Sequence, residues 1–159
     1  MKITKATPGT FERLTEIWES AVRATHHFLP EEKIVFYRSQ IPKYLGGVSE
    51  LLMAVTVNGE ILGFIGTTPP AEKKYAQVEM LFVDAVIHGQ GVGKALLRHV
   101  ADRYGPLEVD VNEQNPGALA FYEKCGFHVA GRSDTDMLGD PFPILHLASE
   151  YLTPSAEPS

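Results

Sequence analysis

The 159-residue chain is poor in cysteine, in positive charge and in long apolar stretches. Its single cysteine, Cys125, excludes an intrachain disulfide and a zinc site built from several thiolates. The formal net charge of -6 argues against nonspecific binding to nucleic acid or to acidic membrane surfaces. No segment approaches the roughly 20 apolar residues that span a bilayer, and "MKITKATPGT" lacks the apolar core of a signal peptide. We therefore expect a cytoplasmic protein with no nucleic-acid or membrane partner.

What the chain does have is enough apolar sequence for a core. Hydrophobic residues make up 44% of the composition, and a chain of this length most often forms one domain. We expect that domain over residues 1–152. The remaining stretch, "TPSAEPS" at residues 153–159, is polar and rich in proline and serine, which predicts a disordered tail.

The apolar pattern of the first third predicts one strand and two helices. "KITKA" is typical of a short strand, and Thr7 with Pro8 predicts the start of a helix. The apolar stripe of that helix runs from Phe11 to Val22. A second helical pattern follows "THHFLP", and Pro42 is expected to kink or end it.

The rest of the chain predicts six strands and two helices. Asn58-Gly59 between "LLMAVTV" and "EILGFIGT" predicts a hairpin with a two-residue turn. "AQVEMLFVDA", "LEVDV", "FHVAG" and "PILHLAS" are further strand candidates. Helical periodicity follows residue 91, and Asn115, Pro116 and Gly126 predict the cap, first turn and end of the last helix. This order indicates an α/β fold around one central sheet.

The stretch "HGQGVGKALLRH", residues 88–99, places three glycines at alternate positions ahead of a helix. Such turns commonly hold phosphate, because free backbone N–H groups and the positive end of the helix dipole meet there. The Rossmann pattern fails at Lys94, where a glycine is needed, and the Walker A pattern fails at His88 and Ala95. Taken alone, the loop therefore fits either a phosphate site or a tight turn without a ligand.

A second motif narrows these alternatives. "LFVDAVIHGQGVGKALL" followed by "NPGALAFYEKCGF" resembles the paired motifs of the GNAT superfamily, the Gcn5-related N-acetyltransferases. Two positions differ from the usual pattern: His88 stands where Arg or Gln is common, and Ala85 replaces a proline. The order of elements also resembles that superfamily. Within it, "ATHHFL", "VNEQN" and "GRSDTDMLGDPFPILHLA" are similar to the bacterial YjaB-type acetyltransferases.

The resemblance implies a GNAT fold: a single mixed, mostly antiparallel sheet of about seven strands, about four helices, and a splayed strand pair at the cofactor site. It implies an acetyl-CoA-dependent N-acetyltransferase in which a primary amine attacks directly in a ternary complex. We expect the acceptor to be a small-molecule or peptide amine, and the protein to be a monomer or a homodimer. Two alternatives remain open: a CoA-binding regulatory domain without turnover, and a nucleotide-binding domain.

Acetyl-CoA would meet two surfaces. Backbone N–H groups of the loop and Lys94 suit its pyrophosphate, and the resemblance assigns its pantetheine arm to backbone groups of Leu81 and Val83. Asn115 fits either a pantetheine contact or a helix cap. The complete set of expected cofactor-binding residues is Leu81, Phe82, Val83, His88, Gly89, Gln90, Gly91, Val92, Gly93, Lys94, Asn115 and Phe121.

Acetyl transfer to an amine needs a proton acceptor and a proton donor. Tyr122 occupies the tyrosine position of the second motif, so we expect it to protonate the departing thiolate. Glu79 is the expected base, because strand alternation places it on the face of Leu81 and Val83. Ordered water or a different carboxylate is the alternative base.

"ATHHFLP" falls where GNAT proteins build their acceptor wall. Adjacent histidines cannot both point inward from a helix, and we expect His26 to be the one that contacts the acceptor. No ligand spacing accompanies His26 and His27, so we expect no metal site. Cys125 is expected to be a small core residue, and Asp136 is a further candidate for the acceptor pocket on position alone.

Overall fold

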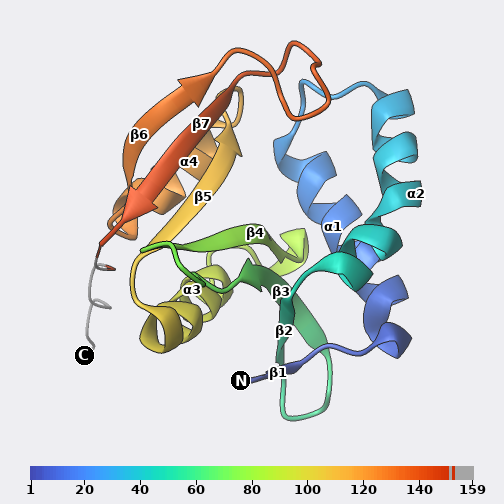
Figure 1. The fold of residues 1–159 in the computed structure, drawn as a ribbon. Helices are drawn as coiled ribbons and strands as arrows, with labels where there is room; N and C mark the ends of the chain where they lie inside the picture. The colour runs from blue at the N-terminus through green and yellow to red at the C-terminus, as the bar shows by residue number, and fades with distance from the viewer. Residues whose placement is uncertain (151, 153–159) are drawn as a thin grey trace.

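A computed structural model describes residues 1–150 and 152, so the predicted tail at residues 153–159 lies outside the described residues. The chain forms a seven-stranded sheet with the order β1-β2-β3-β4-β5-β7-β6 (Figure 1). All neighbours are antiparallel except β4 and β5, which are parallel. The strands are β1 (Lys2–Lys5), β2 (Glu50–Val55), β3 (Ile61–Thr68), β4 (Ala76–Val83), β5 (Leu107–Asn112), β6 (His128–Ser133) and β7 (Ile144–Ser149).

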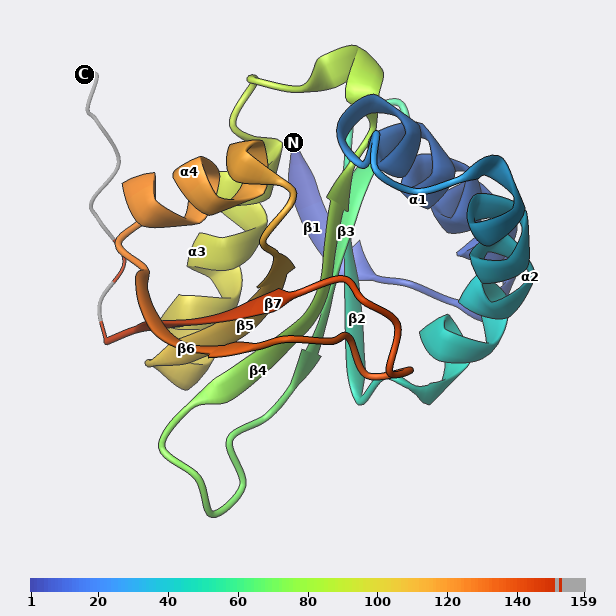
Figure 2. The same cartoon turned by 90° about the horizontal axis from the view of Figure 1, so that it is seen from above.

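Two helices cover each face of the sheet (Figure 2). α1 (Phe11–Thr25) and α2 (Glu31–Gly47) pack through Leu14, Ile17 and their neighbours against Met53 and Phe64. α3 (Val92–Tyr104) packs on the other face, and α4 (Pro116–Lys124) joins it there. Short 3-10 turns, η1 (Pro8–Thr10) and η2 (Ala85–Ile87), precede α1 and follow β4. The predicted element order and the GNAT-type architecture are thus confirmed.

The sheet forks between β4 and β5. These strands pair only from Ala76 to Val78 on β4 and from Leu107 to Val109 on β5, although both continue further. Figure 1 shows them diverging, with β5, β7 and β6 on one arm and β4 to β1 on the other. Beyond residue 78, the side of β4 that faced β5 has no strand partner among the described residues. The predicted splayed pair is therefore present, and it leaves an open strand edge.

A β-bulge marks the point where the strands separate. On β3, Thr67 pairs with Val78 while Gly66 pairs with Met80, so Glu79 is an extra residue without a cross-strand partner. Because a bulge adds one residue and bends its strand, the alternation of side chains changes phase there. Val78, Leu81 and Val83 accordingly share the α3 core, whereas Met80 and Phe82 pack with α1 and α2.

One local expectation was wrong, and one of the two outcomes expected for Pro42 does not occur. The β2–β3 turn holds three residues rather than two: the N–H of Thr56 donates to the carbonyl of Glu60 at 2.9 Å, and Gly59 has φ 87°. A left-handed glycine at the end of a three-residue loop is the usual alternative to the two-residue turn. Pro42 also does not end its helix, because α2 continues to Gly47. No described helix has both the length and the apolar character needed to cross a membrane.

Candidate functional site

The glycine-rich loop forms a tight turn at the start of α3. Gly89 has φ 84° and Gly91, the N-cap of the helix, has φ 82°. This left-handed conformation favours glycine, and a Cβ built at either position meets nothing within 4 Å. The loop surface is therefore open at the positive end of the helix, where backbone N–H groups are free of intrahelical partners. This geometry fits an anion such as a pyrophosphate.

His88, which departs from the family pattern, ties the loop to the end of β4. Its Nε2 lies 2.9 Å from the carbonyl oxygen of Val83, so Nε2 carries the proton and donates. The ring is exposed, as are Gly89, Gln90 and Gly91. His88 thus makes a hydrogen bond within the protein, between the glycine-rich loop and the end of β4.

Asp84, which the sequence analysis missed, fastens the end of β4 to α1. Its carboxylate accepts hydrogen bonds from Arg13 Nη2 at 2.8 Å, from Ser20 Oγ at 3.2 Å and from the N–H of Val86 at 3.2 Å. Burial opposes its ionised form, but these three donors outweigh that cost and lower the pKa of Asp84. The turn that carries the loop is therefore held in place by a charged contact to another element.

Several expected cofactor residues pack the walls of the site instead of facing open space. Val92, Gly93 and Asn115 are buried. A Cβ on Gly93 would lie 3.2 Å from Phe121 Cζ and 3.6 Å from Val83 Cγ2, so α3, α4 and β4 meet at this glycine. Asn115 Oδ1 accepts from the N–H of Ala118 at 3.1 Å, which confirms its expected role as the helix cap.

Tyr122 lies directly behind this contact. Its ring packs edge-on against the rings of Phe121 and Phe127, with centroid distances of 5.1 Å and 5.2 Å. The residue is 6% exposed. Burial raises the pKa of Tyr122 above its ordinary value, and nearby Cys125 adds to the effect. The hydroxyl therefore stays protonated across the physiological range, as a proton donor must. Cys125 is itself 4% exposed within the core, as predicted.

Glu79 occupies a different face from the one expected. The bulge breaks the alternation that would have placed it with Leu81 and Val83. Its Oε2 instead accepts from Thr68 Oγ1 at 2.8 Å, and Thr68 pairs with Gln77 on the side of β4 opposite the Val78 core. Glu79 therefore opens onto the α1–α2 side of the fork, away from the glycine-rich loop.

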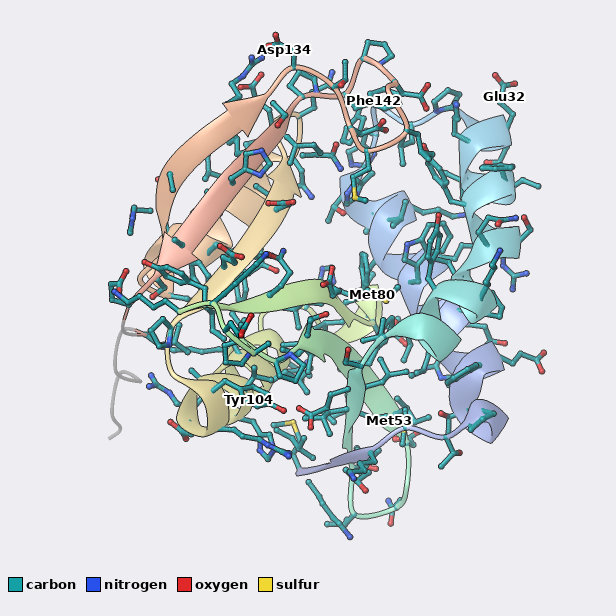
Figure 3. The ribbon with its side chains drawn as sticks, in the orientation of Figure 1. Glu32, Met53, Met80, Tyr104, Asp134 and Phe142 are labelled. Carbon is teal, nitrogen blue, oxygen red and sulfur yellow. The ribbon has the colours of Figure 1, made fainter. Side chains whose placement is uncertain are left out.

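On the α1–α2 side, aromatic rings connect the α1–α2 connection to the β6–β7 loop. The His26 ring lies 5.3 Å from Phe28, and Phe28 lies 5.7 Å from Phe142 of the β6–β7 loop. Lys33 Nζ also contacts Asp140 Oδ2 of that loop at 3.0 Å. In Figure 3, Met80 of β4 lies below the loop that carries Phe142. The β6–β7 loop thus contacts the α1–α2 connection and α2, which lie far from it in sequence.

His26 is the inward member of the histidine pair, whereas His27 is exposed. Thr25 Oγ1 donates to the carbonyl of Ala21, so at 2.8 Å it accepts from Nδ1–H of His26. Burial, with a smaller contribution from His27, lowers the pKa of His26 to about 4. His26 is consequently neutral at physiological pH, and its Nε2 is unprotonated.

The sequence also did not predict a cluster of three polar side chains on the face of the sheet opposite α3 and α4. His146 of β7 lies between Asp110 of β5 and Ser133 of β6, with Nδ1 to Oδ1 and Nε2 to Oγ distances of 2.7 Å each. Asp110 and His146 alternate with core residues in "LEVDV" and "PILHLAS", so their outward orientation was predictable. Their proximity was not, because it depends on β7 inserting between β5 and β6.

Outside the fork, a groove of about 530 Å³ begins at the glycine-rich loop and follows α3. Basic side chains of Lys94 and Arg98 line it together with His99. Among the described residues, no group of three or more His, Cys, Asp or Glu side chains is arranged to hold a metal ion.

Similarity to known proteins agrees with this geometry. Residues 11–127 match the family model described as "Acetyltransferase (GNAT) family". The chain is 38% identical over 139 residues to peptidyl-lysine N-acetyltransferase YjaB of Salmonella typhimurium, covering 86% of this chain and 89% of that protein. YjaB of Escherichia coli is 36% identical over 140 residues, covering 86% and 88%.

Solved structures show the same fold. The solution structure of apo YjaB from Escherichia coli aligns with a TM-score of 0.85 and 34% identity, covering 94% of this chain and 97% of that one. A PaiA N-acetyltransferase from Thermoplasma acidophilum, solved with coenzyme A, aligns with a TM-score of 0.71 and 20% identity, covering 94% and 98%. The chain belongs to the GNAT acetyltransferase family and is an acetyl-CoA-dependent N-acetyltransferase.

Proposed function

We propose that this protein transfers the acetyl group of acetyl-CoA directly to a primary amine, with a peptide lysine as its preferred acceptor. The observation that carries the proposal is the fork. It opens a strand edge between the glycine-rich loop on one side and a face bearing Glu79 and Asp110 on the other. Carboxylates attract an alkylammonium group, and the two YjaB relatives are named peptidyl-lysine N-acetyltransferases.

The donor fits the residues present. Acetyl-CoA supplies an acetyl group activated as a thioester. The loop from Gly89 to Lys94 would hold its phosphates, and the groove along α3 would extend that contact through Lys94 and Arg98. Backbone groups of Leu81 and Val83 on the open edge of β4 would pair with the amides of the pantetheine arm.

Tyr122 is proposed as the general acid. Its position beside Phe121 places it next to the meeting point of α3, α4 and β4. Burial keeps that hydroxyl protonated and able to donate to a departing thiolate.

Glu79 is proposed to receive the acceptor. A lysine amine has a pKa near 10.4, so it arrives charged and must lose a proton before it can attack. The exposed carboxylate of Glu79, held by Thr68, would bind the ammonium group and take this first proton directly or through water. His26, whose Nε2 is unprotonated and whose ring packs beside Phe28, is proposed as an acceptor contact.

The test is an acceptor screen that follows release of free thiol from acetyl-CoA. A peptide with a blocked N-terminus and one lysine is compared with the same peptide carrying arginine, with spermidine and with free amino acids. We expect turnover of the lysine peptide alone, with the acetyl group located on the lysine by mass spectrometry. Binding of acetyl-CoA without turnover of any amine would contradict the proposal and favour a regulatory CoA-binding module.

We further propose that the protein acts in the cytoplasm as one domain, as a monomer or a homodimer, without a nucleic-acid or membrane partner. The net charge of -6 supports the absence of a nucleic-acid partner. Size-exclusion chromatography with light scattering measures the oligomeric state, and a particle larger than a dimer would contradict this part.

A further inference from the structure

The carbonyl group of Val83 points to the open edge of β4. Backbone groups of successive residues in a strand point to opposite edges. The N–H of Asp84 points to β3, because it donates to the carbonyl of Leu62 at 3.0 Å. The carbonyl of Phe82 also points to β3, since its oxygen would lie 2.8 Å from a Cβ on Gly63. The N–H and carbonyl of Val83 therefore point away from β3, to the side where the end of β4 has no strand partner among the described residues.

The side chain of His88 occupies this carbonyl. Nε2 of His88 lies 2.9 Å from the Val83 oxygen, and a carbonyl can only accept, so the ring donates. We call this hydrogen bond the edge cap. An exposed strand edge is a template for pairing with another extended segment, and Val83 is the last residue of β4. The edge cap thus satisfies the last outward carbonyl of the strand.

The turn between β4 and the glycine-rich loop brings the imidazole back to the strand. In η2, the N–H of Ile87 donates to the carbonyl of Asp84 at 3.0 Å, and the N–H of His88 lies 3.3 Å from the carbonyl oxygen of Ala85. Figure 2 shows the chain leaving β4, passing through η2 beside α1 and returning to the start of α3. The ring itself is exposed, so it can leave Val83 without disturbing the core.

The same carbonyl is the group that an extended ligand would use. The pantetheine arm carries amides, and pairing with the β4 edge brings an N–H of the arm to the Val83 oxygen. A carbonyl oxygen has two lone pairs, but a strand-like partner must lie along the edge, where the imidazole sits. We propose that the edge cap and the arm of acetyl-CoA exclude each other, so that His88 must release Val83 before the donor is fully bound. This inference rests on the pairing of the arm with β4 that is proposed above.

This exclusion makes His88 a determinant of donor affinity. A ligand that must displace a competing contact binds more weakly, in proportion to the fraction of molecules in which its site is open. A single neutral hydrogen bond is strong enough to keep that fraction at roughly one third to one tenth. Loss of the edge cap should therefore strengthen binding of the arm about 3- to 10-fold.

The first test measures affinity for acetyl-pantetheine, which carries the arm and the thioester of the donor but no phosphates. NMR titration compares the unaltered protein with His88→Ala, with His88→Phe and with the control His128→Ala, at an exposed histidine on the outer strand β6. We expect both His88 variants to bind about 3- to 10-fold more tightly, and His128→Ala to bind as the unaltered protein does. Phenylalanine keeps a ring and removes the donor. A folded His88→Phe that binds no more tightly than the unaltered protein would overturn the hydrogen-bond competition.

The second test needs no variant. In a crystal structure of the unaltered protein with acetyl-CoA, we expect Nε2 of His88 to lie beyond hydrogen-bonding distance of the Val83 oxygen, with an amide of the arm in its place. A complex that keeps the edge cap beside a bound arm would overturn the proposal alone. Binding of acetyl-CoA with an arm that does not pair with Val83, or with no binding of acetyl-pantetheine to any of the proteins, would refute the proposed pairing and the edge cap with it. Absent binding of acetyl-CoA would refute the donor site itself.

Discussion

Tyr122, the proposed general acid, must stay protonated before the reaction and must give up its proton during it. Its ring is enclosed by Phe121 and Phe127, and this burial raises the pKa of the hydroxyl. A hydroxyl with a raised pKa stays protonated, yet it is a weaker acid toward a thiolate. In the proposed reaction the leaving thiolate would still accept the proton, because the burial that disfavours a tyrosinate also disfavours a charged thiolate. Burial thus keeps the hydroxyl protonated, and packing against Phe121 and Phe127 fixes the orientation of the ring.

Replacing Tyr122 by phenylalanine tests this role. The change keeps the ring contacts and removes the proton donor, so we expect kcat to fall roughly 10- to 10³-fold with little change in acetyl-CoA affinity. Steady-state kinetics and calorimetric titration measure the two effects. Tyr104→Phe is the matched control, because it removes a hydroxyl that donates to Glu50 at 3.1 Å on another part of the molecule. Unchanged kcat at saturating substrates would remove Tyr122 from the reaction.

His26 makes fold stability depend on pH. Burial lowers its pKa to about 4, so the unfolded chain, with an ordinary pKa near 6.5, binds a proton more readily. The stability that this neutral histidine contributes is complete above about pH 6.5 and is lost as the pH falls toward 4. The loss is on the order of 2 kcal/mol.

His26→Gln should weaken this dependence, since glutamine does not titrate in the range. The measurement is the free energy of unfolding in urea at several values between pH 7 and 4.5. His27→Gln, at the exposed neighbour, should leave the slope unaltered. If both variants change the slope equally, the burial of His26 is not its cause.

At the scale of elements, a comparison of two glycines distinguishes the backbone conformation that the glycine-rich loop needs from its proposed role in binding a ligand. Gly91 and Gly59 both have left-handed φ values, 82° and 87°, and a Cβ on either meets nothing within 4 Å. An aspartate should therefore strain both turns similarly, by about 1 kcal/mol. Only Gly91 opens the helix end where the phosphates are proposed to bind.

We expect Gly91→Asp to weaken acetyl-CoA binding at least tenfold through negative charge in the phosphate cradle, which is about 1.4 kcal/mol. Gly59→Asp should match it in thermal stability and keep full affinity. Isothermal titration with acetyl-CoA and thermal unfolding give both quantities. Equal affinity in a folded Gly91→Asp would contradict the placement of the phosphates.

The turn after β4 depends on Asp84 in a similar way. Asn at this position keeps the shape but loses the charge paired with Arg13 and one accepting oxygen. We expect Asp84→Asn to lower the free energy of unfolding by about 1–2 kcal/mol and to weaken acetyl-CoA binding several-fold, because the loop beyond it loosens. Asp134→Asn, at a side chain 89% exposed, is the control. Normal affinity despite lost stability would show that Asp84 supports the fold without positioning the loop.

Elements with strong local signals were predictable from the sequence, whereas features set by neighbouring strands were not. Pro116 and Asn115 define α4 locally, and the stripe from Phe11 to Val22 defines α1. The bulge at Glu79 depends on the register of β3 against β4, so local alternation gave the wrong face. Pro42 lies within a helix that packs through Ile34, Ile41 and Leu45, and this tertiary packing outweighs the local cost of proline.

The same distinction applies to the site. The paired motifs predicted the loop, Asn115 and Tyr122 as site residues because their positions follow from chain-local structure. They did not identify Asp84, whose partners are 64 and 71 residues away in sequence, or the contacts of His146 with Ser133 and Asp110, which are 13 and 36 residues away. Such contacts exist only once the strand order brings their strands and helices together.

At the scale of the whole molecule, two cores lie on opposite faces of the sheet. One core includes α1 and α2, and the other, with α3 and α4, packs against strands of both arms of the fork. The β6–β7 loop contacts the α1–α2 connection through Phe142 and the first turn of α2 through Asp140. Figure 1 shows this loop next to the start of α2. The proposed acceptor space is therefore bounded by elements from both ends of the chain.

Removing the ring contact across this boundary should affect the acceptor and spare the donor. Phe142→Ala loses the contact with Phe28, a kind of pair worth about 0.5–1.5 kcal/mol, so we expect KM for the lysine peptide to rise about 3- to 10-fold. The glycine-rich loop lies at the start of α3, whose core is on the other face, so acetyl-CoA affinity should not change. Met137→Ala, in the same loop but 99% exposed, should leave both constants unaltered. A parallel loss of acetyl-CoA affinity in Phe142→Ala would mean that the loop holds the two arms of the fork at their working angle and does not form an acceptor wall.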